Sequence, residues 1–209
     1  EELEEINYNK LLNHMEKLNN EAIRMSNFFK RIDPLASNKR SKCRRISITK
    51  QINDIIEIFG NKEEVQYVAT SVDNAKIAEN DYNHNSVEEL YTNIITDDFY
   101  MALTNIIENA LFWVEYSSEL SRLIEILSYG DDNKVYIEIL DNGPGISKED
   151  LENNILFTPG YSGKKRVTDD NGTGLGLAIS GEALQRNNGK LEVIESNKGA
   201  CFRITLQRS

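Results

Sequence analysis

Two asparagines four residues apart, Asn105 and Asn109, are the first side chains in this sequence whose type and spacing suggest chemistry. They lie within a run of apolar residues at intervals of three and four, which predicts an amphipathic helix. The apolar residues of this run are Met101, Leu103, Ile106, Ile107, Ala110, Leu111 and Val114. Residues four apart share one helix face, and asparagine is a weak helix former. The pair either forms caps or core hydrogen bonds, or it presents neutral oxygen ligands to a hard cation such as magnesium.

A carboxylate followed by glycines forms the second candidate. Residues 134–140 alternate and are rich in isoleucine and valine, which predicts a strand, and Asp141 stands at its end. Asn142-Gly-Pro-Gly145 then forms a turn that needs the freedom of glycine. A carboxylate in this place can accept a hydrogen bond from the amino group of a base while the backbone closes over the ring. The alternative is an ordinary Asp-Asn-Gly turn.

A glycine-rich segment, Gly172-Thr-Gly-Leu-Gly-Leu177, precedes another helical pattern. Glycines before a helix let backbone amides approach phosphate oxygens, and the helix N-terminus favours anions. The segment is not the dinucleotide fingerprint, because the third glycine of that motif would fall at Leu177. A Walker loop is excluded as well, because Lys164 is followed by Lys165 and the earlier glycine is replaced by Thr158.

In this order the three segments resemble the GHKL, or histidine-kinase-like, ATP-binding family. Its members are sensor histidine kinases, type II topoisomerase ATPase subunits, mismatch-repair ATPases and ninety-kilodalton heat-shock chaperones; the catalytic domains of sensor histidine kinases are the most similar. The resemblance covers roughly Ile46 to Leu206, and it adds a fourth element. Phe157-Thr-Pro-Gly-Tyr-Ser-Gly-Lys164 resembles the phenylalanine-containing box of the kinases, followed by a mobile lid.

The resemblance implies ATP and Mg²⁺ as cofactors and assigns roles to the matching residues. Asn109 is expected to bind magnesium, and Asn105 is a catalytic residue near the phosphates. Asp141 recognises the adenine amino group, while the glycine-rich segment presents amides to the phosphates. The expected nucleotide-binding residues are Asn105, Asn109, Trp113, Asp141, Gly143, Gly145, Phe157, Lys164, Gly172, Thr173, Gly174, Leu175, Gly176 and Leu177.

Three of the positions near this site leave alternatives open. Lys164 is either the lid cation that reaches the β- or γ-phosphate or a solvated loop lysine. Where the kinases commonly carry a basic residue and then tyrosine, this chain has Phe112 and Trp113. Trp113 either stacks near the adenine or packs in the core, and core packing is the preferred interpretation for Phe112. A phosphate-binding cation is therefore missing from this helix.

Asn105 also separates two chemistries within the family. The ATPases carry a glutamate there, which acts as general base on the attacking water, whereas asparagine cannot take up a proton at neutral pH. Glu108 lies about a hundred degrees round the helix from Asn109 and cannot simply substitute. The sequence therefore favours transfer of the γ-phosphate to a histidine outside this fragment. An ATP-driven dimerising clamp and an ATP-sensing module without catalysis are the alternatives.

The N-terminal residues 1–33 predict one long helix with an apolar seam, which implies a partner helix. The seam residues are Tyr8, Leu11, Met15, Leu18, Ala22, Met25, Phe29 and Ile32. In histidine kinases the second helix of the dimerisation hairpin occupies this place, so the resemblance implies a homodimer. We expect residues 1–44 to form this helical dimerisation and linker segment and residues 45–209 the catalytic domain. His14 lacks the sequence pattern of the family's phosphoacceptor and is expected to be an ordinary surface histidine.

The remaining pattern predicts an α/β fold, a two-layer sandwich with a mixed sheet and helices on one face, which is the Bergerat ATP-binding fold of the family. The expected strands are 46–48, 65–70, 122–127, 135–140, 190–194 and 200–206, with a turn at 197–199 before the last. Residues 52–59 predict a further helix, and residues 72–96 a polar insertion of unknown role.

Composition and charge exclude several classes of function. The formal net charge of −10 argues against a nucleic-acid or anionic-membrane surface. Two cysteines, Cys43 and Cys201, give no disulfide framework, which is typical of a reducing, cytoplasmic compartment. No apolar run reaches membrane-spanning length, so we expect no membrane contact in this fragment. The kinase resemblance adds two-component signalling with a response-regulator-like partner.

Overall fold

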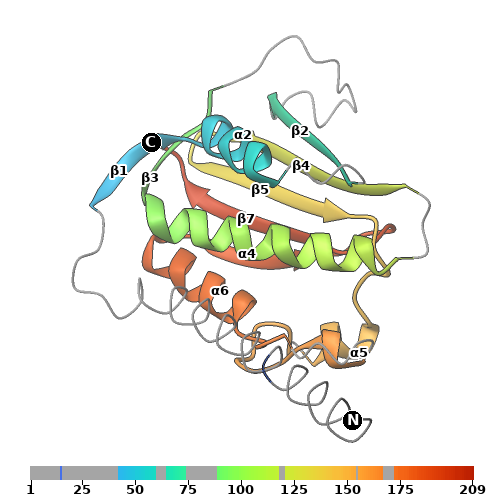
Figure 1. Ribbon diagram of the computed structural model, residues 1–209. Helices are drawn as coiled ribbons and strands as arrows, with labels where there is room; N and C mark the ends of the chain where they lie inside the picture. Colours follow the sequence, from blue (N-terminus) through green and yellow to red (C-terminus); the bar gives the residue numbers. More distant parts are fainter. Residues whose placement is uncertain are drawn as a thin grey trace, which may run out of the picture. The chain divides into compact units, whose positions relative to one another are not determined.

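A five-stranded sheet with helices on one face forms the larger of two units in the computed structural model (Figure 1). The structure describes residues 42–59, 65–73, 89–117, 121–153, 155–166 and 172–209, together with Met15. The chain divides into units Glu1–Arg40 and Ser41–Ser209. In the first unit the description is confined to Met15, which is helical and exposed. The predicted helix over 1–33, its dimer contact and His14 therefore lie outside the described residues.

The sheet is mixed, as the sequence predicts. Its strands stand in the order β2 (Val65–Asp73), β4 (Arg122–Gly130), β5 (Lys134–Asp141), β7 (Cys201–Gln207) and β6 (Lys190–Ile194). β2 runs parallel to β4, and every other neighbouring pair is antiparallel. Alternate side chains of the central strands are buried, because a strand directs successive side chains to opposite faces. The core face is thereby supplied by every second residue.

Three helices cover this core face (Figure 1). They are α2 (Ile48–Phe59), α4 (Thr96–Glu115) and α6 (Gly176–Arg186). α4 crosses the sheet, packing against the strands with one face of the helix and against α6 with another. Most of its apolar residues are fully buried. The predicted two-layer sandwich with helices on one face is therefore confirmed. None of the helices in the described part of the chain is both long and apolar enough to cross a membrane.

A second, two-stranded sheet corrects part of the sequence interpretation. β1 (Cys43–Ser47) pairs antiparallel with β3 (Tyr91–Ile95). Residues 72–96 were expected to be a polar insertion, but β2 extends to Asp73 and β3 occupies the far end of the range. The β3 signal is only five residues long, and its partner strand lies far back in the sequence. Ile48, expected in a strand, instead begins α2 and is fully buried.

A buried ion pair fixes how α4 and α6 lie together. Asp98, in the first turn of α4, is 1% exposed. Its carboxylate accepts a hydrogen bond from the Arg186 guanidinium at 2.9 Å and another from the Asn187 amide at 2.9 Å. The Asn187 side chain in turn accepts the backbone N–H of Ile95 at 2.9 Å. The start of α4 is thus bound to the end of α6, so the two helices run antiparallel.

We predict that Asp98→Asn lowers the free energy of unfolding by about 1.5–3 kcal/mol, the usual range for a hydrogen bond to a charged group. The substitution keeps the shape of the side chain but leaves the Arg186 guanidinium, 24% exposed, without its counter-charge. Urea unfolding measures the change. Asp54→Asn, at an exposed position of α2, is the control and is expected to cost less than about 1 kcal/mol. Equal losses in both variants would contradict the assigned role.

Candidate nucleotide-binding site

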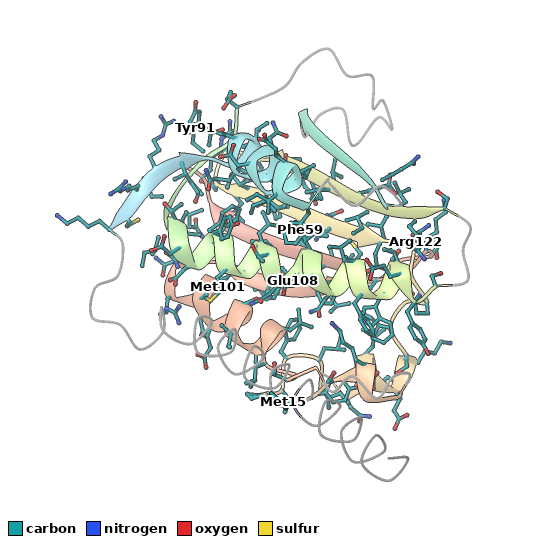
Figure 2. All side chains as sticks on the ribbon, in the orientation of Figure 1. Met15, Phe59, Tyr91, Met101, Glu108 and Arg122 are labelled. Carbon is teal, nitrogen blue, oxygen red and sulfur yellow. The ribbon has the colours of Figure 1, made fainter. Side chains whose placement is uncertain are left out.

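The predicted motifs, far apart in the sequence, meet beside the second half of α4. They are the asparagines of α4, the loop that follows β5, residues 155–166 and residues 172–177. Residues 155–166 end in the 3₁₀ turn η1 (Gly163–Arg166), and residues 172–177 lead into α6. In the sequence, the short helix α5 (Lys148–Glu152) lies between the β5 loop and residues 155–166. Figure 2 shows the side chains around α4, with Glu108 near the middle of that helix.

Asn105 joins α4 to the first turn of α6. Its side chain is buried, and its Nδ2 donates to the Gly176 carbonyl oxygen at 3.3 Å and to Ser180 Oγ at 3.1 Å. Ser180 Oγ donates to the same carbonyl at 2.8 Å. Asn109, half-buried, lies one turn further along the same helix face. Asn105 therefore acts here as a hydrogen-bond donor that positions the start of α6.

Asp141 is a buried carboxylate at the end of β5, with 2% of its surface exposed. Its Oδ1 accepts the backbone N–H groups of Gly143 at 2.9 Å and Ala200 at 3.2 Å. Burial raises the pKa of the carboxyl above its usual value, although both backbone hydrogen bonds act to lower it. The described hydrogen bonds go to Oδ1, so Oδ2 is the oxygen that can accept an amino N–H from a ligand.

Gly199 belongs to this site, although the sequence interpretation placed it only in a turn. Its φ is +58°, and a Cβ there would lie 1.9 Å from the carbonyl oxygen of Asp141. Gly145 packs against the same residue, since a Cβ on it would lie 3.3 Å from the Gly199 carbonyl oxygen. Only the sheet topology could have predicted this contact between Gly199 and Asp141. Because β7 pairs with β5, the turn that enters β7 must pass the end of β5 and therefore Asp141.

The glycine-rich segment is bound to the segment before it. Gly160 N–H donates to the Gly174 carbonyl oxygen at 3.0 Å. Gly174 has a φ of +65°, and a Cβ on it would lie 2.5 Å from backbone atoms of Gly160 and Tyr161, so this close approach requires glycine. Exposed Thr173 accepts the N–H of Leu175 through Oγ1 at 3.4 Å.

α6 begins directly after this approach, with Leu175 at its N-cap. In the described part of the chain no side chain caps this end of the helix, and the first backbone N–H groups of a helix are suited to bind an anion. Leu177, in the first turn, is half-buried and packs against the core. The segment therefore brings a helix N-terminus up to the asparagines of α4.

Trp113 lies where the β5 loop and η1 approach α4. A Cβ on Gly143 would stand 3.0 Å from Trp113 Cβ, and one on Gly163 would stand 3.5 Å from its ring at Cζ2. The indole is half-buried, and it faces the two loops instead of joining the buried core. Phe157 is half-buried and packs against the core. These contacts bring Trp113 to the border of the Asp141 region, where a flat ring can stack.

Lys164 of η1 reaches back to α4. Its ammonium lies 4.2 Å from the centroid of the Phe112 ring, within the range of a cation–π interaction. The expected core packing of Phe112 is not found, because its ring is half-buried and lies outside the core cluster. Contacts of this kind link most of the predicted site residues between α4, the β5 loop, η1 and the start of α6, whereas Phe157 packs against the core.

Comparison with known proteins identifies the family to which this chain belongs. Residues 94–209 match the family described as histidine kinase-, DNA gyrase B- and HSP90-like ATPases. The chain belongs to this family. The matched residues include every side chain that the sequence interpretation assigned to the nucleotide, from Asn105 to Leu177. Membership of this family of ATPases supports ATP binding by the chain.

Two sensor kinases are among its relatives. The chain is 31% identical over 105 residues to the adaptive-response sensory kinase SasA of Prochlorococcus marinus. It is 36% identical over 122 residues to the sensor histidine kinase WalK of Bacillus subtilis. These matches cover 50% and 56% of this chain but only 27% and 19% of the two relatives.

Solved structures show the same fold. The catalytic domain of histidine kinase ThkA has a TM-score of 0.61 at 19% identity, over 80% of this chain and 96% of that chain. ThkA in complex with the response regulator protein TrrA has a TM-score of 0.66 at 19% identity, over 94% of this chain and 51% of that one. At this identity the likeness establishes the fold alone.

We predict that Asp141→Asn stabilises this ATPase-family domain and weakens its binding of ATP. A raised pKa means that ionisation of the buried carboxyl costs stability. That cost is absent below the usual value of 3.8 and develops as the pH rises through the folded-state pKa. The gain in unfolding free energy should therefore be present at pH 7 and shrink toward pH 4. Urea unfolding at several pH values measures it.

The same variant should bind ATP about 10- to 150-fold more weakly by calorimetry, because a hydrogen bond to a charged acceptor is lost. Asp132→Asn, at an exposed position in the turn after β4, is the matched control and should change neither quantity. A variant that binds ATP as tightly as the unchanged protein would contradict the assignment of Asp141 to the adenine.

Proposed function

We propose that this chain contains the Mg²⁺-ATP-binding catalytic domain of a sensor histidine kinase. In this proposal the γ-phosphate of ATP passes to a histidine outside these 209 residues. The bond between the γ-phosphorus and the ADP oxygen breaks as a phosphorus–nitrogen bond to the imidazole forms, and ADP leaves with the electron pair. Family membership and the sensor-kinase relatives support this function over a small-molecule kinase.

The adenine end of the nucleotide is assigned to Asp141 and Trp113. The Asp141 carboxylate accepts the exocyclic amino group through Oδ2, since its described hydrogen bonds occupy Oδ1. Trp113 offers a ring that lies against Gly143 of the same loop, and Gly145 closes the loop beside the base. A purine with a carbonyl in place of the amino group would leave the buried carboxylate without a donor, so the site should prefer adenine to guanine.

The phosphate end is assigned to residues 172–177 and to Asn109. The uncapped first turn of α6 supplies backbone N–H groups for phosphate oxygens. Asn109 lies on the helix face from which Asn105 reaches α6, so its amide oxygen is suited to a hard cation. Bound magnesium would neutralise phosphate charge. Lys164 adds a cation close to the same segment.

The hydrogen bonding of Asn105 is the single observation that favours transfer over hydrolysis. A general base must accept a proton from water, whereas this side chain donates to the Gly176 carbonyl oxygen and to Ser180 Oγ. A carboxylate at the same place would have no proton to donate to that carbonyl. The first turn of α6 is thus built around a donor, and an imidazole that is itself the nucleophile needs no base at this position.

The partners of the domain are part of the same proposal. We assign residues 1–44 to a dimerisation and linker helix and residues 45–209 to the catalytic domain, on the strength of the apolar seam between Tyr8 and Ile32. A response-regulator-like protein is the proposed receiver, supported by the solved complex of ThkA with such a protein. A cytoplasmic location is supported by the two free cysteines, Cys43 and Cys201.

The decisive experiment follows the γ-phosphate of labelled ATP in the longest natural form of this protein with magnesium present. We predict acid-labile, base-stable label on the protein, which is the behaviour of phosphohistidine. Free phosphate without protein label would replace the kinase by an ATPase clamp. Tight ATP binding without either product would leave an ATP-sensing module.

We also predict that Asn109→Ala reduces magnesium-dependent ATP binding at least about tenfold and removes the label. Asn93→Ala, at an exposed asparagine of β3, serves as the matched control and should keep both. Thermal unfolding of the two variants verifies that each is folded. Full ATP affinity in Asn109→Ala would refute the metal assignment while leaving the fold untouched.

A further inference from the structure

The helix that carries both asparagines supplies negative charge to its surroundings and no positive charge. α4 contains no lysine or arginine over its whole length, Thr96–Glu115, whereas it contains two aspartates and two glutamates. Asp141 adds a further carboxyl at the adenine end. The triphosphate of ATP is itself strongly negative, so cations from other elements have to offset the repulsion. Lys164 is a cation that the structure brings directly against α4.

The side chain of Lys164 runs between α4 and the glycine-rich segment. At its tip, the ammonium lies 4.2 Å from the centroid of the Phe112 ring. Along its stem, Cδ lies 3.2 Å from the place where a Cβ on Gly172 would stand. The residue is half-buried, so its charge is partly shielded from water. Lys164 thus lies next to the segment to which the phosphates are assigned.

Phe112 is held in place by two neighbouring aromatic rings. Its ring meets Trp113 edge to face, with centroids 5.1 Å apart, and stacks on Tyr116 with centroids 6.0 Å apart and planes 7° apart. We call Phe112, Trp113 and Tyr116 the aromatic platform. Packing of this kind limits the rotation of the central ring. A fixed ring face attracts a lysine ammonium and restricts the many rotamers of its long stem.

We propose that Phe112 is a positioning residue that holds the Lys164 ammonium beside residues 172–177, where it binds the terminal phosphates of ATP. This inference rests on the proposed function, because it requires a triphosphate at that segment. An ammonium above a ring can bind an anion on its other side. The aromatic platform thereby makes a flexible lysine a preordered phosphate ligand, and Trp113 links the adenine end to the phosphate end.

The test measures dissociation constants of ATP and AMP by calorimetry on the full chain with magnesium present. Phe112→Leu keeps apolar volume but removes the ring, and we expect ATP to bind about 3- to 30-fold more weakly. AMP should bind as before, because it lacks the terminal phosphates. Phe112→Tyr keeps the ring and should restore ATP affinity.

Coupling between the two residues provides the sharper readout. Lys164→Gln removes the charge and should weaken ATP, with little effect on AMP. In the Lys164→Gln background, Phe112→Leu should cause no further loss, because the ring acts through the lysine. If the two substitutions weaken ATP binding independently, so that their fold-losses multiply in the double variant, the proposal is overturned. Equal losses of ATP and AMP affinity in Phe112→Leu would overturn it as well.

A measurement without nucleotide guards against a variant that fails to fold. In the unchanged protein the side-chain protons of Lys164 lie over an aromatic face, so their NMR signals should show a ring-current shift. Phe112→Tyr should keep the shift, and its absence from the unchanged protein would overturn the pairing. If the unchanged chain binds no ATP, the proposed function fails and this inference fails with it. If ATP binds and Asn109→Ala weakens binding as predicted while Phe112 and Lys164 prove uncoupled, this inference alone fails.

Discussion

The burial of α4 on two sides is the constraint on which the rest of this structure depends. The helix packs against the sheet with one face and against α6 with another, so its apolar residues are shielded almost from end to end. Burial on two sides restricts where such a helix can carry polar side chains, because a buried polar group without a hydrogen-bond partner costs free energy. The two buried polar residues of α4, Asp98 and Asn105, mark where another element binds.

Two such residues fix the position of α6, and they do so at opposite ends of the contact. Asp98 binds the end of α6 through Arg186 and Asn187, and Asn105 binds its first turn through Gly176 and Ser180. The uncapped N-terminus of α6 is thereby held against the half of α4 that carries Asn109. The proposed phosphate site depends on this helix placement, because backbone N–H groups cannot move independently to meet a ligand.

Negative and positive charges around the site come from different elements. The end of β5 has the buried carboxyl of Asp141, whose pKa is raised by burial, and α4 contributes acidic residues and no basic ones. Positive charge comes from Lys164 of η1, held over Phe112. In this arrangement the cation belongs to the 3₁₀ turn η1, whereas Asp141 lies at the end of β5 and Asn109 lies in α4.

The sequence by itself determined the type of most major elements and supplied the candidate residues of the site. Its short-range patterns sufficed, because hydrophobic periodicity identifies α4 and the β4–β5 hairpin, and the glycine positions identify the loops. Only the tertiary structure decided which residues touch. β3 was missed because its pairing with β1 spans a long stretch of chain, and Gly199 was missed because its contact with Asp141 arises from the pairing of β7 with β5. Phe112 was expected in the core because periodicity reports which residues are apolar, whereas the ring's place under Lys164 depends on where η1 folds back. Contacts between distant segments arise from packing, and local sequence carries no record of them.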